Sequence, residues 1–290
     1  MKYDPNYQSD DVEDRRREGG GGGGGGSGLI GFLLSILLRT RYGWIIVILG
    51  FIGYVAAKQL GLIGPAATSG PRGTATSTLP AGDTDAHFVA FVLDDAQKFW
   101  EEDFSAQHRQ YRHAKLVLFT DQTPTACGYG DAATGPFYCG SDEKVYIDLG
   151  FFRVLSNQLG AKGQFARAYV IAHEVGHHVQ KLLGTAARGT QGHVVGESGA
   201  SVRLELQADC YAGVWASSAG RRGLLERGDI ESALEAASRI GDDVLQREET
   251  GRVRPEKFTH GTAAQRFRWL KRGYDSSNMA ECDTFGAGTL

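Results

Sequence analysis

The chain has 290 residues, of which 41% are hydrophobic, and its formal net charge is -3. This length and apolar content allow one sizeable hydrophobic core together with additional segments. The small charge gives no sign of the basic surface that is typical of nucleic-acid-binding proteins, so we expect no nucleic acid among the partners.

Residues 1–28 are predicted to form a disordered cytoplasmic tail. They are polar and charged, and they end in a glycine run from Gly19 to Gly26. Such a segment offers no apolar surface to offset the entropy of ordering the chain. We interpret the basic residues Arg15, Arg16 and Arg17 as part of a solvated tail rather than as a lipid-binding patch.

Residues 29–64 are predicted to be the membrane region. Leu29 to Leu38 is apolar but shorter than the roughly 20 residues that a membrane span requires. Residues 42–63 are long enough for a single transmembrane helix if Lys58 extends its amine to the membrane surface. The first apolar stretch then either lies in the membrane interface or forms part of the span.

The distribution of basic residues orients this predicted span. More basic residues precede it, including Arg39 and Arg41, than follow it. The positive-inside rule therefore places the N-terminus in the cytoplasm and the C-terminal part outside, as in a single-pass protein of the cell membrane. A hairpin of two spans would reverse the side of the C-terminal part, but the first apolar segment is short for this purpose.

Residues 65–82, rich in Gly, Ala, Thr, Ser and Pro, are predicted to be a flexible linker. A folded domain is predicted over residues 83–290, beginning with an amphipathic helix over 85–105. Strand patterns occur at 114–120 and 145–149. We therefore expect an α+β fold that is mainly helical and has a small β-sheet.

His173, Glu174 and His177 form the pattern His-Glu-x-x-His inside a predicted helix. Residues four apart lie on one face of an α-helix, so both imidazoles can reach a single metal ion. Glu174 lies beside them, close enough to act on a metal-bound water. An apolar stripe predicts that the helix is half buried, and buried imidazoles need polar partners. The pattern therefore favours a metal site over a chance occurrence.

A second helix, predicted over residues 200–219, offers a third ligand. Glu205 and Asp209 are four residues apart and share a face. Hydrolytic zinc sites usually take three protein ligands and leave one position for water. Glu205 would complete a site of two histidines and one glutamate, and Asp209 would accept the free N–H of one imidazole. Their mostly apolar neighbours disfavour the alternative of a solvated acidic face.

The two motifs resemble those of the gluzincin metallopeptidases. The longer runs His-Glu-Val-Gly-His-His-Val-Gln and Glu-Leu-Gln-Ala-Asp-Cys-Tyr-Ala-Gly-Val-Trp, with Cys-Asp-Thr-Phe near the end, resemble the bacterial neutral zinc metallopeptidase family. The resemblance extends from about residue 83 to the C-terminus. It implies a zincin-like domain with one catalytic Zn²⁺ and a peptide or protein substrate, but it identifies neither the natural substrate nor the oligomeric state.

Two further features follow from the resemblance. In zincins an edge strand ahead of the metal helix often pairs with the substrate, and residues 137–139 are the candidate here, with an ordinary hairpin as the alternative. Some gluzincins place a histidine after the third ligand, where it hydrogen-bonds the transition-state oxyanion. His260, with Arg266, would take this catalytic role, and a helix-capping or surface histidine is the alternative.

Four cysteines allow three disulfide pairings. We expect Cys127–Cys139, which closes a short loop, and Cys210–Cys282, which ties the C-terminal tail to the second helix. Disulfides form readily outside the cytoplasmic membrane, in agreement with the predicted topology.

These residues predict a membrane-anchored zinc endopeptidase. Glu174 would act as general base on a zinc-activated water and then as acid toward the leaving amine. Two other classes remain open: a membrane-tethered adaptor that binds zinc without turnover, and an amidase that acts on cell-wall peptides. Glu174 argues against the adaptor, because a protein that only binds zinc needs no base beside the metal.

Overall fold

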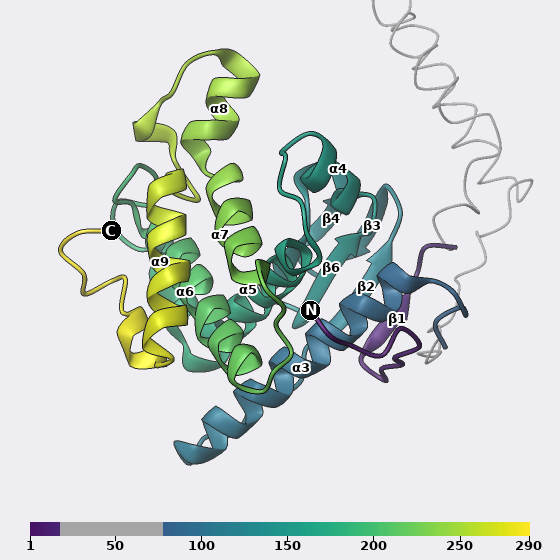
Figure 1. Cartoon of the computed structure of the whole chain (residues 1–290). Helices are drawn as coiled ribbons and strands as arrows, with labels where there is room; N and C mark the ends of the chain where they lie inside the picture. Colours follow the sequence, from purple (N-terminus) through teal and green to yellow (C-terminus); the bar gives the residue numbers. More distant parts are fainter. Residues whose placement is uncertain (18–77) are drawn as a thin grey trace, which may run out of the picture. The chain divides into compact units, whose positions relative to one another are not determined.

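A small mixed β-sheet and several helices share one hydrophobic core (Figure 1). In this computed structural model the described residues are 1–17 and 78–290. The sheet has the strand order β1-β2-β6-β5, in which β5 alone runs antiparallel to its neighbour. Its strands are β1 (Val12–Asp14), β2 (Lys115–Phe119), β5 (Phe137–Cys139) and β6 (Lys144–Asp148).

The two faces of the sheet contact different parts of the protein, as the alternation of side chains along a strand requires. Leu116 and Leu118 of β2 belong to the main core, which also contains residues of the helices. Val117 and Phe119 point the opposite way and form a smaller cluster with Tyr146. Next to the sheet, β3 (Gln122–Thr125) and β4 (Gly128–Asp131) form a separate two-stranded hairpin.

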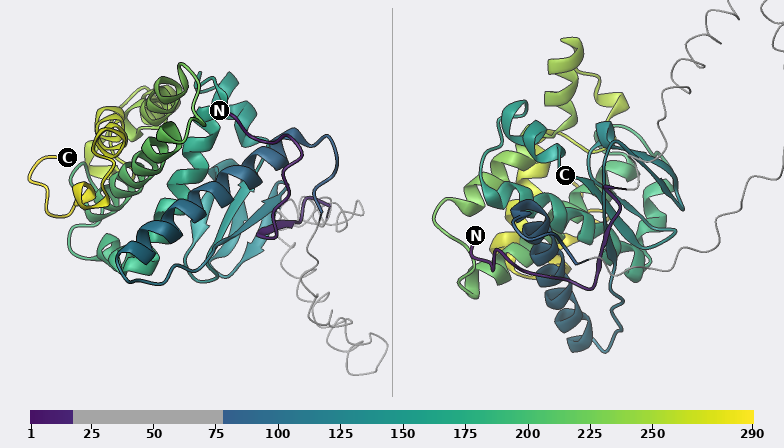
Figure 2. Two further views of the ribbon diagram at one scale, coloured as in Figure 1. Left: turned by 60° about the horizontal axis from the view of Figure 1, so that its bottom comes forward. Right: turned by 90° about the vertical axis from the view of Figure 1, so that its right-hand side faces the viewer.

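The helices pack on the first of these faces, and Figure 2 shows α3 lying across the sheet. The α-helices of the described residues are α3 (Thr84–Ala106), α4 (Phe151–Asn157), α5 (Gln164–Leu183), α6 (Ala200–Arg221), α7 (Asp229–Arg239), α8 (Asp242–Thr250) and α9 (Ala263–Ser276). Short 3₁₀ helices are η2 (Ala132–Thr134), η3 (Thr185–Thr190), η4 (Pro255–Lys257) and η5 (Met279–Cys282). The observed architecture confirms the prediction of a mainly helical fold with a small sheet.

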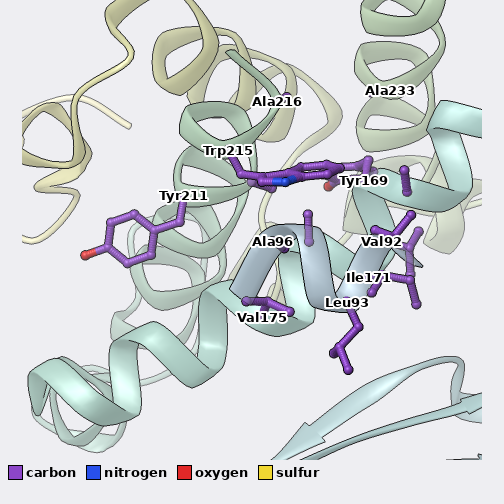
Figure 3. Close-up of a cluster of buried hydrophobic side chains, with 14 of the residues drawn as sticks. Val92, Leu93, Ala96, Tyr169, Ile171, Val175, Tyr211, Trp215, Ala216 and Ala233 are labelled. Carbon is purple, nitrogen blue, oxygen red and sulfur yellow. The ribbon is translucent and has the colours of Figure 1, made fainter. Parts of the chain in front are cut away.

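Aromatic side chains fill the space between the helices. Trp215 of α6 is buried among side chains from α3, α5 and α7 (Figure 3). Its ring stacks on Phe165 of α5, with 5.6 Å between the ring centroids. Trp100 of α3 makes an edge contact with Tyr211 of α6. These contacts fix the long helices relative to one another, so side chains that they present on a shared surface have defined positions.

Residues 1–17 belong to the folded unit, and the prediction that they are disordered is wrong. Val12 is buried, and β1 pairs with β2 in parallel from Val12 opposite Leu116. The polar residues that suggested a solvated tail have specific partners: Arg16 pairs with Asp83 at 2.6 Å, and Lys144 pairs with Glu13 at 2.6 Å. Composition failed here because these charges are neutralised by side chains that lie far away in the sequence.

The N-terminal boundary of the domain differs from the prediction for the same reason. Asp83 does begin α3, where its side chain accepts a hydrogen bond from the N–H of Ala86. The segment just before it is also packed, since Leu79 is buried and its backbone N–H and carbonyl both bond to the side chain of Gln8. Residues 78–82 are therefore part of the folded unit rather than of a flexible linker.

The predicted membrane region, residues 29–64, and most of the predicted linker lie outside the described residues. Within residues 1–17 and 78–290, no helix combines the length and the apolar composition that a membrane crossing requires.

The place of β1 in the fold is tested by Val12→Ala. Loss of the buried methyl groups should cost about 1–2 kcal/mol, from ~0.8 kcal/mol per CH₂ and a cavity term. Thermal unfolding of the full chain should then shift down by roughly 2–4 °C for each kcal/mol lost. Asn6→Ala, at an exposed position of the same segment, is the control and should unfold like wild type. Identical unfolding temperatures for all three proteins would mean that β1 does not contribute to the fold.

Candidate metal centre

Helix α5 presents His173 and His177 side by side. Most residues of this helix, Gln164–Leu183, are buried, and the imidazoles of His173 and His177 lie on the face toward α6. Their rings are 4.7 Å apart at an interplanar angle of 88°. The spacing of four residues thus places two ring nitrogens at one point, as the sequence predicted.

Glu205 of α6 faces this point from the neighbouring helix. Its Oε2 lies 3.1 Å from His173 Nε2, and its Oε1 lies 3.4 Å from His177 Nε2. Ligand atoms bound tetrahedrally at the usual Zn–N and Zn–O lengths of about 2.0–2.1 Å are themselves about 3.3 Å apart. The two distances from Glu205 match this spacing, the three ligand atoms all lie within 4.8 Å of one another, and imidazole and carboxylate donors both suit zinc.

The close approach of α5 and α6 depends on Gly176, which lies between the two histidines. A Cβ atom at this position would lie 3.0 Å from the carbonyl oxygen of Ala208 and 3.1 Å from its Cα. The small residues Gly176 and Ala208 therefore let the two backbones come near enough for Glu205 to reach both imidazoles.

Both histidines have a partner for the ring nitrogen that faces away from Glu205. His173 donates from Nδ1 to Asp209 Oδ1 at 2.7 Å, and His177 donates from Nδ1 to Gln180 Oε1 at 2.9 Å. A donated Nδ1–H fixes the tautomer in which Nε2 carries the lone pair, and this lone pair is what a metal needs. Asp209 thus lies where the sequence analysis expected it, whereas the contribution of Gln180 was missed.

Asp209 is held by two further side chains. Arg266 of α9 makes a two-pronged contact, with Nε 2.9 Å from Oδ2 and Nη2 2.9 Å from Oδ1. Tyr169 of α5 donates its hydroxyl to Oδ1 at 2.5 Å. Arg266 was predicted to assist His260 at the oxyanion, but its guanidinium is instead buried against Asp209. No spacing rule could identify this pair, because the two residues lie on different helices and far apart in the chain.

The charges of the site are strongly coupled. Burial opposes the ionisation of Asp209, but the positive charges of Arg266 and His173 lower its pKa to about 2. Burial alone would lower the pKa of His173, yet Asp209 and Glu205 raise it to about 10. Two ionised carboxylates therefore create a strong preference for positive charge at this point, which a metal cation would satisfy.

Glu174 lies beside the histidines at the wall of a cleft. Burial raises the pKa of its carboxyl group, an effect that the neighbouring His173 and His177 oppose. Among the described residues its carboxylate has no hydrogen-bond partner, although the side chain is 7% exposed. A nearly buried carboxylate without a protein partner is costly to maintain, and it faces the space where a water molecule and a substrate would lie.

The cleft is lined by both polar and apolar side chains. Its polar lining includes the three residues of the cluster and Glu174, and its apolar lining includes Phe137, Phe151, Val154 and Leu159. Strand β5 borders it at the edge of the sheet, and the outer side of β5 pairs with no other strand of the described residues. Tyr138 OH lies 2.8 Å from His178 Nδ1, and this contact ties β5 to α5.

His260 also lines the cleft, from the loop before α9. The carboxylate of Asp242, at the start of α8, accepts the N–H groups of Thr259, His260 and Gly261 at 2.7, 2.7 and 3.0 Å and so fixes this loop. Interaction with Asp242 raises the pKa of the His260 imidazole against the effect of burial. The role of Asp242 was not visible in the sequence.

Both predicted disulfides are present, Cys127–Cys139 and Cys210–Cys282. The first joins the β3–β4 hairpin to strand β5 beside the cleft. The second joins α6, one residue after Asp209, to η5 near the C-terminus. Each disulfide thus braces an element that carries part of the site.

Sequence comparisons agree with this arrangement. Residues 1–285 match the protein family described as "Putative neutral zinc metallopeptidase". The chain belongs to this family. The match includes residues 1–17, in keeping with the place of β1 in the sheet.

Relatives come from distant bacteria. The chain is 44% identical to "Uncharacterized protein YpfJ" of Escherichia coli K12, over 99% of each chain. It is 48% identical to "Uncharacterized protein Rv2575" of Mycobacterium tuberculosis H37Rv, over 62% of this chain and 65% of that protein. No solved structure gives a significant match.

Asp209→Asn tests the support of His173. The amide keeps the size of the side chain but removes the charge that binds Arg266 and the imidazole, and loss of such a partner typically lowers metal affinity about 10–100-fold. Zinc affinity would be measured by competition with a chelator on folded protein. Asp275→Asn, at an exposed position of α9, is the control. Wild-type affinity in Asp209→Asn would show that Asp209 does not orient the ligand.

Proposed function

We propose that the protein is a zinc-dependent endopeptidase. The observation that carries the proposal is the convergence of His173, His177 and Glu205, whose ligand atoms lie within 4.8 Å of one another, with the unpartnered carboxylate of Glu174 beside them in a cleft. Membership of a zinc metallopeptidase family supports the same reaction class.

Each residue has a role that follows from its position. A bound zinc ion would supply a Lewis acid and lower the pKa of an attacking water to about 7. Glu174 takes the proton from this water and delivers it to the leaving amine, and its raised pKa suits both transfers. His260, whose imidazole is held by Asp242, which raises its pKa, would donate a hydrogen bond to the oxyanion that develops at the scissile carbonyl.

A peptide would be bound along the free edge of β5. An extended segment can add to an exposed strand edge through backbone hydrogen bonds, which position it without regard to its side chains. The apolar lining of the cleft then offers room for substrate side chains. The zincin-like arrangement expected from the motifs has this same layout, with the edge strand ahead of the metal helix.

Two other functions predict different outcomes. A zinc-binding adaptor would need no unpartnered carboxylate beside its metal. The lack of a hydrogen-bond partner for the Glu174 carboxylate among the described residues therefore favours an enzyme. A cell-wall amidase would use the same chemistry on a different amide, and activity on peptidoglycan fragments against activity on protein substrates separates these two hydrolases.

Glu174→Gln tests the reaction. The substitution keeps the size of the side chain and removes the base, so bound zinc should stay close to one ion per chain while peptide cleavage falls by about 10²–10⁴-fold. Zinc would be measured by elemental analysis and cleavage by mass spectrometry on a peptide mixture. Glu248→Gln, at an exposed position of α8, is the control. A wild-type protein that holds no zinc would refute the proposal, and zinc binding without cleavage of peptide or peptidoglycan would favour the adaptor.

His260→Ala tests the oxyanion role separately. Loss of one donor to a transition-state oxyanion typically lowers kcat by about 10²–10³-fold, with little change in KM or zinc content. His193→Ala, which removes an exposed histidine outside the residues that line the cleft, should leave kcat unchanged. An unchanged kcat in His260→Ala would assign this histidine to the loop structure alone.

A further inference from the structure

The chain leaves the folded unit after residue 17 and returns to it at the same place. Gln8 exchanges two hydrogen bonds with the backbone of Leu79, at 2.9 and 3.2 Å. The ring of His87 lies 2.7 Å from the carbonyl oxygen of Tyr7 and 3.1 Å from that of Pro80. Figure 1 shows the N-terminal segment beside the start of α3. Residues 18–77 are thus connected at both ends to one region of the protein.

The pairing of β1 restricts how residues 18–77 can cross a membrane. Paired strands lie about 4.8 Å apart, whereas the hydrocarbon layer of a bilayer is about 30 Å thick. A single crossing between residues 17 and 78 would leave β1 and β2 on opposite sides of this layer. The backbone hydrogen bonds between them exclude that arrangement, so the number of complete crossings must be even.

Because β1 is part of the folded unit, the basic residues near it cannot be used in the same way to orient the chain in a membrane. Arg16 is one of the basic residues that precede the predicted span, but it pairs with Asp14 and Asp83 in the folded unit. The basic residues that stay close to the apolar stretches are Arg39 and Arg41, which lie between the stretch 29–38 and the stretch 42–57. The positive-inside rule applied to Arg39 and Arg41 therefore concerns residues 18–77 and does not place β1 on the cytoplasmic side.

We propose that residues 1–17 and 78–290 lie together on the extracytoplasmic side of the membrane, so that any membrane crossing within residues 18–77 is matched by a return crossing. The two disulfides support this side, because such bonds persist in oxidising compartments and are rare in the cytosol. The proposal replaces the single-pass topology that the sequence predicts. It is independent of whether the protein hydrolyses peptides.

Cysteine labelling of the full chain tests the proposal. The four native cysteines are paired in disulfides, so an added cysteine is the free thiol of each variant. Asn6→Cys places it in the N-terminal segment and Glu248→Cys places it on α8, both at exposed positions. Spheroplasts that carry either variant would be treated with a membrane-impermeant maleimide, before and after permeabilisation. Unchanged thermal unfolding of the two variants shows that neither substitution disturbs the fold.

Each variant should react as fully before permeabilisation as after it, because both added thiols lie outside the cytoplasmic membrane. If Glu248→Cys reacts at once and Asn6→Cys reacts only after permeabilisation, the two segments lie on opposite sides and the proposal is overturned. If both react only after permeabilisation, the extracytoplasmic placement is overturned, since both segments then lie in the cytoplasm.

Discussion

The buried contact of Asp209 with His173 and Arg266 is the interaction on which the rest of the site depends. One carboxylate joins three helices, because it belongs to α6, accepts from the imidazole on α5 and pairs with the guanidinium on α9. Removing one partner of a buried ion pair typically costs about 3–5 kcal/mol, since the remaining charge stays uncompensated. Helix packing and the orientation of the metal ligand therefore cannot vary independently, because a shift of α9 would remove the guanidinium that holds Asp209 in place against His173.

The packing of α6 on α9 explains how Arg266 reaches the buried carboxylate of Asp209. A Cβ on Gly273 would lie 1.9 Å from the carbonyl oxygen of Cys210, and a Cβ on Gly213 would lie 2.1 Å from that of Leu270. Only glycine at both positions allows the backbones to touch. Gly213 follows Asp209 by four residues and Gly273 follows Arg266 by seven, so each glycine shares a helix face with one member of the ion pair. The close crossing thus places the carboxylate opposite the guanidinium.

Local patterns explain which parts of this structure could be predicted. The spacing of His173, Glu174 and His177 determines a helix face, and the alternation around Val145 determines a strand, because both depend on neighbours within a few residues. Contacts between distant segments leave no such period. Arg266 reaches Asp209, and β1 reaches β2, across long stretches of chain, so neither was found. The misjudged segment, residues 1–17, had the polar composition of a disordered tail because its ordering depends on partners such as Asp83 and Lys144.

The two edge strands of the sheet, β1 and β5, lie in different surroundings, and this difference links the architecture to the proposed function. A strand edge presents unpaired N–H and C=O groups and attracts any extended chain. At one edge β1 occupies these groups on β2 from within the same molecule, while at the other edge β5 keeps its outer side free next to the cleft. The free edge of β5 borders the cleft that contains Glu174, so a peptide added to this edge would lie at the candidate site. The N-terminal segment that forms the other edge is the one whose pairing with β2 carries the proposed membrane topology. Strand pairing at the two ends of the sheet thus carries the two proposals separately, the path of a peptide at β5 and the membrane topology at β1.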